Sequence, residues 1–331
     1  MNQSATPTAT PSVEMPRMNT PWVESPFFEK ELRQAGLDAP TEAMVRQYAD
    51  QGYLVFDPQI PVEIIDEARE SMIPRFEKEN ATRFQDVWRE NKAVQQIAAA
   101  PRVLEVLELL YHREPIPFQT LNFNVGTQQR THSDSIHFDS VPQRFMCGVW
   151  VALEDVTDDN GPLHYYPGSH KFPVYNLVDI GLKGSESKSI QDMLQRYYVK
   201  YEDFIEAFIA EQGLQRQTLN MKKGQAIIWA SNLLHGGDKI KRPGSTRHSQ
   251  VTHYYFADCA YYAPMLTDMA IERVNIRKIT NIATGQEIPS RYLGKDIDHA
   301  GYSYKIGLPT ELLRKLFPES LRKTLKGLLH R

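Results

Sequence analysis

Two His-x-Asp triplets, His132-Ser133-Asp134 and His137-Phe138-Asp139, start five residues apart near the middle of the chain. Side chains two residues apart point to the same side of an extended backbone, so each imidazole–carboxylate pair could bind one metal ion. His235 lies far along the chain and is followed by two glycines, which allow a close approach of the backbone. Two histidines and one carboxylate on one face of a metal form the facial triad of non-heme Fe(II) oxygenases, and they also suit catalytic zinc. The residues therefore predict a metal centre in which either triplet supplies two ligands.

An arginine and a tryptophan predict a binding function beside this centre. Arg247 opens an expected strand, where period two places it on one face with Ser249, Val251 and His253. An arginine that faces a barrel interior needs an anionic partner, which is either a ligand carboxylate or an internal acidic residue. Trp150 lies on another expected strand, where it forms one wall for a planar ligand or simply packs in the core.

Together these motifs resemble the phytanoyl-CoA dioxygenase family of Fe(II)- and 2-oxoglutarate-dependent oxygenases. The resemblance covers roughly residues 40 to 260. The motifs that carry it are His132-Ser133-Asp134, the strand with Trp150, Asn160-Gly161-Pro162-Leu163, Pro167-Gly168-Ser169-His170, His235-Gly236-Gly237 and Arg247-x-Ser249.

The resemblance implies that His132, Asp134 and His235 bind Fe(II). It also favours the first triplet over the second. His132 stands eighteen residues before Trp150, an interval that fits the family without a gap, whereas the use of His137 would shorten the connecting loop by five residues. The second triplet would then lie on the loop over the site, in contact with substrate or with solvent.

The resemblance further implies a site for the cosubstrate 2-oxoglutarate. Arg247, with Ser249, would bind its distal carboxylate, and Asn124 on the strand before the loop would contact the same molecule. Trp150 would line this site. The interval between the distal histidine and the arginine is one residue longer than in the family, so nearby Arg242 stays an alternative to Arg247.

The elements expected around these residues predict a mainly β protein with helical additions. Short strands are expected over residues 53–56, 118–125, 144–155, 163–166, 217–221, 225–230 and 247–256, with Gly- and Pro-containing turns between several of them. Helices are expected to begin near residues 41, 61 and 101, with Pro74 kinking or shortening the second, and an insertion over 186–213 is expected to be helical. This pattern favours a double-stranded β-helix, the jelly-roll or cupin-like barrel, within a domain over residues 26–262.

Both ends of the chain differ from this domain. Residues 1–25 are rich in Thr, Pro and Ser and predict a disordered arm. Residues 263–331 are expected to form an extension that ends in a basic amphipathic helix, because residues 311–331 carry six Lys and Arg against two Glu around a leucine stripe. Such a helix can lie on an anionic membrane surface, but more often it docks on its own domain or on a second subunit.

Composition excludes several classes of protein. The net charge of −3 argues against a nucleic-acid-binding surface, which would require a strongly basic domain or stripe. Cys147 and Cys259 are the only cysteines, too few for a disulfide framework, and they favour a reducing compartment. No signal-peptide pattern and no apolar run of about 18 residues occurs. We therefore expect a cytoplasmic protein.

These observations predict an Fe(II)- and 2-oxoglutarate-dependent dioxygenase that hydroxylates a small-molecule or acyl substrate and releases succinate and CO₂. A zinc-type metal-dependent hydrolase or isomerase is the first alternative, but it would leave Arg247 without a function. A non-catalytic barrel that binds a small ligand is the second, and the intact set of metal ligands argues against it.

Overall fold

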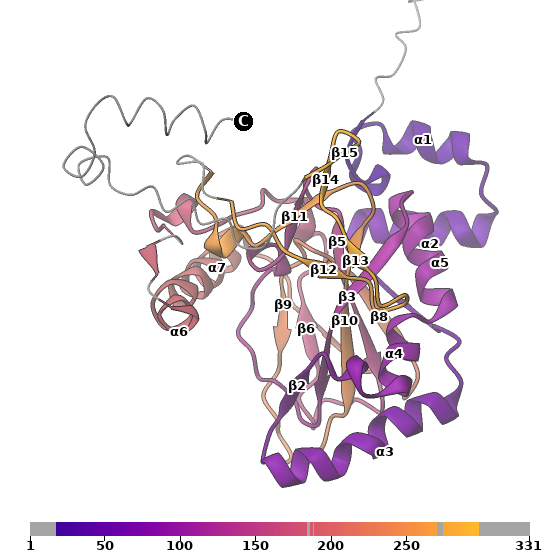
Figure 1. Ribbon diagram of the computed structural model, residues 1–331, viewed down its shortest axis with the longest axis vertical. Coiled ribbons are helices and arrows are strands. Elements are labelled where there is room, and N and C mark those ends of the chain that lie inside the picture. The colour runs from indigo at the N-terminus through magenta and orange to yellow at the C-terminus, as the bar shows by residue number, and fades with distance from the viewer. Residues whose placement is uncertain (1–17, 184–185, 188, 270–273, 298–331) are drawn as a thin grey trace, which may run out of the picture.

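Two facing β-sheets form the centre of the computed structural model, which describes residues 18–183, 186–187, 189–269 and 274–297 (Figure 1). The larger sheet is antiparallel and has the order β1-β8-β5-β10-β3-β2, and the smaller has the order β7-β6-β9. The bounds of the larger sheet are β1 Tyr53–Phe56, β8 Ala226–Ala230, β5 Met146–Ala152, β10 Ser249–Phe256, β3 Pro115–Phe123 and β2 Arg83–Gln85. Those of the smaller are β7 Gln217–Leu219, β6 Leu163–Tyr165 and β9 His235–Gly237. The predicted jelly-roll core with helical additions is confirmed.

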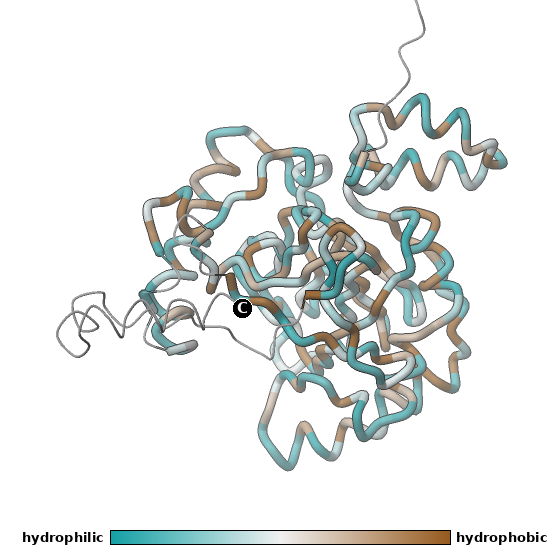
Figure 2. Tube along the Cα trace, turned by 45° about the horizontal axis from the view of Figure 1, so that its top comes forward, coloured by the Kyte–Doolittle hydropathy of each residue, from teal (hydrophilic) through white to brown (hydrophobic). Residues whose placement is uncertain are grey.

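Helices cover the face of the larger sheet that points away from the smaller one (Figure 1). They are α2 Ala39–Gln51, α3 Val62–Glu79, α4 Lys92–Ala98 and α5 Pro101–Tyr111, with α1 Phe28–Ala35 beyond them. Along these helices hydrophobic and hydrophilic positions alternate, and the hydrophobic ones pack on the sheet as one core (Figure 2).

The helices expected near residues 41, 61 and 101 are all present, but Pro74 does not shorten the second one. Helix α3 continues through Pro74 to Glu79. A proline inside a helix costs about 3 kcal/mol. The buried stripe of Ile65, Met72 and Phe76 offsets that cost by packing α3 against the core.

A helical insertion lies beside the smaller sheet, within the range where helices were expected. It consists of α6 Ile190–Asp192, a π-helix η7 Met193–Tyr198 and α7 Val199–Gln212. Arg130 ties α7 to the loop that carries the first His-x-Asp triplet, because its guanidinium contacts the carboxylates of Glu202, Asp203 and Glu206. The insertion therefore fixes the start of the loop that carries the first triplet.

Short elements complete the described chain. The short strands pair as β4 Asp139–Val141 with β11 Ala260–Tyr262, β12 Ile279–Thr280 with β13 Glu287–Ile288, and β14 Arg291–Tyr292 with β15 Lys295–Asp296. Single helical turns occur at η1 Trp22–Glu24, η2 Val87–Arg89, η3 Asp134–Ile136, η4 Ser169–Lys171, η5 Val178–Ile180 and η8 Pro264–Leu266.

The disordered arm predicted over residues 1–25 extends too far, because the end of this segment packs on the folded domain. Trp22 and Val23 are 5% and 4% exposed. The indole N–H of Trp22 donates a 2.9 Å hydrogen bond to the carbonyl of Leu109, and its ring stacks on His112. Burial of these two side chains offsets the entropy of ordering the segment. Residues 1–17 of the arm, and the basic amphipathic helix expected near the C-terminus, lie outside the described residues.

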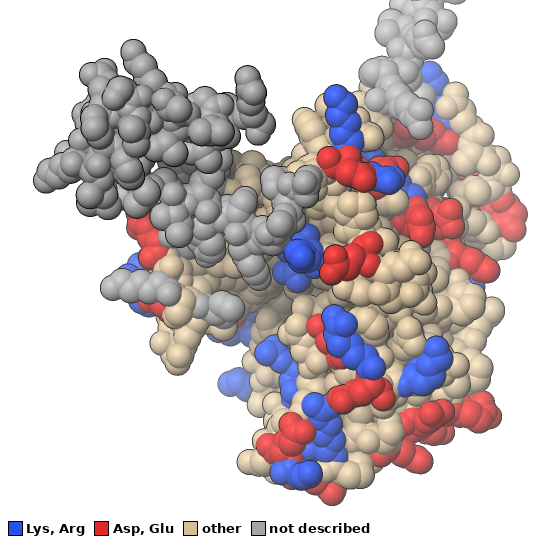
Figure 3. All heavy atoms as spheres, viewed as in Figure 1, with Lys and Arg blue, Asp and Glu red and all other residues tan. Residues whose placement is uncertain are grey.

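Basic and acidic side chains are interspersed over the face shown in Figure 3, so the described residues on it form no single-sign stripe. Among the helices that the structure describes, none combines the length and the apolar character needed to cross a membrane.

The turn between α2 and β1 gives a prediction about stability. Gly52 has φ +77°, and a Cβ there would lie 2.3 Å from Nδ1 of buried His170, whose Nε2 donates to the carbonyl of Ala49. We expect Gly52→Ala to lower the free energy of unfolding by about 2–4 kcal/mol, from backbone strain and overpacking together. Gly36→Ala is the matched control, because Gly36 also has positive φ but nothing lies within 4 Å of its Cβ position. Urea denaturation measures both variants, and equal losses would show that the contact with His170 contributes nothing.

Candidate metal centre

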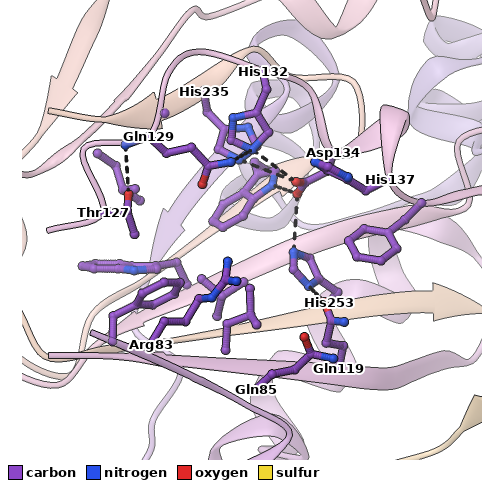
Figure 4. Close-up of a pocket in the computed structure, with 18 of the residues that line it drawn as sticks. Arg83, Gln85, Gln119, Thr127, Gln129, His132, Asp134, His137, His235 and His253 are labelled. Atoms are coloured by element: carbon purple, nitrogen blue, oxygen red, sulfur yellow. Dashed lines mark hydrogen bonds and ion pairs between the residues drawn. The ribbon is translucent and has the colours of Figure 1, made fainter. Parts of the chain in front are cut away.

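His132, Asp134 and His235 come together inside the fold, with ligand atoms that all lie within 4.8 Å of one another (Figure 4). Oδ1 of Asp134 lies 3.7 Å from Nε2 of His132 and 3.9 Å from Nε2 of His235. The two histidines meet because their backbones form two 2.9 Å hydrogen bonds with each other, at the first residue of β9. The extended backbone of Ser133, with φ −113° and ψ 141°, directs its two neighbours to the same side.

Backbone carbonyls orient both imidazoles for metal binding. Nδ1 of His132 donates to the carbonyl of Arg130, and Nδ1 of His235 donates to that of Leu233, each at 2.9 Å. Nε2 of each ring is then the atom that carries the lone pair for a metal, and in His132 this atom also lies 3.2 Å from Nε2 of Gln129. Burial, and after it the nearby His235, lower the pKa of His132 to about 4, and burial also lowers the pKa of His235. Both rings are therefore neutral at pH 7, as metal ligands must be.

The second triplet does not form a comparable pair. His137 lines the same cavity, with its ring centroid 6.2 Å from that of His132. The Asp139 carboxylate has other partners: Oδ1 accepts hydrogen bonds from the backbone N–H groups of Ser140 and Arg144, and Oδ2 accepts one from the hydroxyl of Tyr262. His137 ends a helical turn while Asp139 begins β4, so the two side chains do not share one extended segment. The geometry thus separates the two triplets and supports the first, which the family resemblance also favours.

The same cavity is lined by a buried cation that forms no ion pair with a described residue. Arg247 is 1% exposed, and its Nη1 donates a 2.7 Å hydrogen bond to the carbonyl of Gly161. Its Nε has no hydrogen-bond partner, and no acidic group of a described residue lies within ion-pair distance. Burial lowers the pKa of Arg247 to about 10, against the opposing effect of the Glu154 charge beyond ion-pair distance, so the group remains charged at pH 7. The internal ion pair, the alternative considered for Arg247, is absent from the described part of the chain.

Two further buried polar groups without hydrogen-bond partners lie near this arginine. Trp150 lines the cavity with its ring 5.5 Å from the guanidinium carbon of Arg247, and its Nε1 has no partner. Ser249 Oγ is also buried without a partner, although Ser249 itself is not among the residues that line the cavity. Arg242 is exposed and lies away from the cavity, so the geometry favours Arg247 over it.

Asn124 follows the strand β3, next to the cavity wall, but is not itself among the residues that line the cavity. Strand β3 ends at Phe123, whose side chain does line the cavity, and alternation along the chain directs the next side chain elsewhere. The backbone carbonyl of Asn124 instead accepts a 2.9 Å hydrogen bond from the N–H of Arg247. The side-chain Oδ1 of Asn124 is buried without a hydrogen-bond partner, so its contact with the cosubstrate stays a prediction.

The structure adds residues to the site that the motifs did not identify. Trp229 on β8 donates a 2.7 Å hydrogen bond from Nε1 to Oδ2 of Asp134. His253, which period two had placed on the face of Arg247, lies with Nε2 3.6 Å from the same Oδ2, and its Nδ1 contacts Oε1 of Gln119 at 3.1 Å. The alternation of Ile227 and Trp229 along β8 was the signal that could have identified the tryptophan.

The cavity that the His-Asp-His cluster and Arg247 line has a volume of about 230 Å³. Gln129 lies beside the His-Asp-His cluster, with its Nε2 3.2 Å from Nε2 of His132 and 3.4 Å from the hydroxyl of Tyr198. Arg83 points into the cavity from the edge strand β2, close to Gln85 (Figure 4). Asp134 is the only carboxylate among the described lining residues, so the cavity is suited to anionic ligands.

Comparison with known proteins identifies relatives of this chain. The family model described as phytanoyl-CoA dioxygenase (PhyH) matches residues 61–249. The peroxisomal phytanoyl-CoA dioxygenases of Rattus norvegicus and Homo sapiens are 23% and 24% identical over 187 residues, which cover 54% of this chain. The chain spans about half the length of these curated relatives, 51% of each.

Solved structures share the fold at lower sequence identity. The non-heme alpha-ketoglutarate-dependent epimerase SnoN from nogalamycin biosynthesis is 16% identical with a TM-score of 0.54, covering 80% of this chain and 97% of its own. EctD from S. alaskensis in its apo form is 17% identical with a TM-score of 0.53, covering 76% of this chain and 87% of its own. These likenesses establish the fold, and the family model matches more than half of the sequence. The chain therefore belongs to the phytanoyl-CoA dioxygenase family.

Proposed function

We propose that this protein is an Fe(II)- and 2-oxoglutarate-dependent dioxygenase. The observation that carries the proposal is that one cavity contains both a His-Asp-His cluster and a buried, unpaired arginine. Structures of this fold have been solved with these ligands: SnoN with Fe3+, alpha-ketoglutarate and nogalamycin RO together, and EctD in one structure with bound Fe and in another with 2-oxoglutarate and 5-hydroxyectoine.

The residues present fit both groups. His132, Asp134 and His235 would bind Fe(II), because two neutral imidazoles and one carboxylate leave a local charge near +1 and open positions for a chelating 2-oxo acid. Arg247 would bind the distal carboxylate, which would satisfy its unpartnered Nε, with Trp150 beside it. When bound, iron and 2-oxoglutarate supply an O₂-dependent oxidation that releases succinate and CO₂. The chain itself orients both groups and excludes water from the space between them.

Anaerobic titration tests this proposal. Purified protein is expected to develop a weak visible charge-transfer band only when Fe(II) and 2-oxoglutarate are both present. A protein that instead contains stoichiometric Zn(II) and gives no band would support a hydrolase or isomerase. A screen of small-molecule and acyl compounds, scored by succinate release, then identifies the primary substrate.

We propose hydroxylation, or a related oxidation, as the outcome for the primary substrate, in the cytoplasm. Solved neighbours include an epimerase and a carbocyclase, so the fold permits several outcomes. Halogenation is not expected, because it requires a halide in place of the carboxylate ligand, and Asp134 occupies that position. Asp134 is held in place by the chain at high effective concentration, so a free chloride ion does not displace it.

Turnover of the identified substrate in excess chloride is therefore expected to add one oxygen or to remove two hydrogens. Product mass spectrometry measures this. A chlorinated product from the unmodified protein would contradict the assignment of Asp134 as an iron ligand.

A further inference from the structure

We propose that Trp229 is a positioning residue that restricts Asp134 to a single metal-binding oxygen. This inference rests on the proposed function of the site. It assigns a role to a side chain that lines the cavity beside the His-Asp-His cluster without belonging to it.

The two oxygens of Asp134 have different surroundings. Oδ1 faces Nε2 of His132 at 3.7 Å and Nε2 of His235 at 3.9 Å, so it is the oxygen directed at the metal position. Oδ2 accepts the 2.7 Å hydrogen bond from the indole N–H of Trp229, and Nε2 of His253 lies farther from it, at 3.6 Å. Both side chains are buried, at 4% exposure for Asp134 and 3% for Trp229, so water does not compete for this bond. A hydrogen bond to a charged acceptor in such surroundings is strong.

The backbone of the neighbouring strand fixes the indole in this position. Gly148 on β5 pairs directly with Trp229 on β8. A Cβ at Gly148 would lie 2.4 Å from two carbons of the indole and 2.7 Å from its Nε1. The ring therefore packs directly on the backbone of Gly148. The centroid of the His235 ring lies 4.7 Å from that of the indole. Any larger residue at 148 would displace the N–H from Oδ2.

The number of metal-bound oxygens decides how many positions remain open. In six-coordinate iron, the two imidazoles and one carboxylate oxygen would fill three positions, and a chelating 2-oxo acid would fill two more. One position would then stay open for the oxidant. If Asp134 bound through both oxygens, no position would remain. The Trp229 N–H occupies Oδ2 and so keeps the last position available.

Trp229→Phe tests this inference because it keeps an aromatic ring but removes the donor. Nitric oxide serves as the probe of the open position, measured by electron paramagnetic resonance of the anaerobic Fe(II)·2-oxoglutarate protein. The lost hydrogen bond to a charged group corresponds to about a tenfold to hundredfold effect, so nitric oxide affinity is expected to fall by at least about tenfold. Fe(II) affinity is expected to be unchanged or higher, since the freed oxygen adds a ligand.

Gly148→Ala provides an independent variant, which is expected to reproduce the loss of nitric oxide binding by moving the ring. Trp88→Phe is the matched control: Trp88 is buried and its Nε1 has no partner, but it lies outside the cavity. This control is expected to bind Fe(II), 2-oxoglutarate and nitric oxide like the unmodified protein.

The outcomes separate this inference from the proposed function. If the unmodified protein forms no Fe(II)·2-oxoglutarate complex, the proposed function itself fails. If it does, and Trp229→Phe binds nitric oxide equally well, only the positioning role is overturned. A parallel loss of iron, 2-oxoglutarate and thermal stability in Trp229→Phe would also overturn it, because that pattern indicates a purely structural role.

Discussion

His132→Ala and His235→Ala are each expected to abolish the charge-transfer band that forms with Fe(II) and 2-oxoglutarate. Each substitution removes one of three ligands whose donor atoms converge in a buried site. Loss of a residue that merely orients a ligand lowers metal affinity about 10–100-fold, and loss of the ligand itself is expected to exceed that. Anaerobic Fe(II) titration followed by visible absorption measures the effect.

His137→Ala is the matched control for these two variants. His137 lines the same cavity and belongs to the second triplet, but it is not one of the three clustered ligands. Its removal is expected to leave the band largely intact. If His137→Ala lost iron while His132→Ala retained it, the metal would be bound by the second triplet, and the proposed centre would be wrong.

Arg247→Ala is expected to weaken 2-oxoglutarate binding by at least about tenfold, since hydrogen bonds to charged groups contribute about 1.5–3 kcal/mol each. Fe(II) affinity is expected to stay the same, because the guanidinium is not one of the clustered metal ligands. Calorimetric titration of the metal-loaded protein with 2-oxoglutarate separates the two affinities.

Arg242→Ala is the control for this second prediction. Arg242 is exposed and does not line the cavity, so its removal should not change either affinity. An unchanged 2-oxoglutarate affinity in Arg247→Ala would show that another group binds the distal carboxylate. It would also leave the unpartnered Nε of Arg247 without an explanation.

Local chain geometry made much of this site predictable from the sequence. The extended backbone at Ser133 directs His132 and Asp134 to one side, and that alternation depends only on neighbouring residues. The same period predicted one face for Arg247, Ser249, Val251 and His253, and all of these except Ser249 line the cavity. The strands and helices predicted from apolar periodicity are present for the same reason: burial of one face follows the repeat of the backbone.

Contacts between distant segments determine the partners of Asp134 and Asp139, which the sequence alone did not predict. Trp229 meets Asp134 across 95 residues of chain, because β8 pairs with β5 at Gly148 and brings the indole to the loop. Likewise Tyr262 binds Asp139 from 123 residues away, which removes the second carboxylate from the metal site. Local periodicity determines which face of a strand a side chain lies on, but the order and register of the strands determine which distant residue it contacts there. Only the tertiary structure determines that pairing, because it depends on how all the strands pack together.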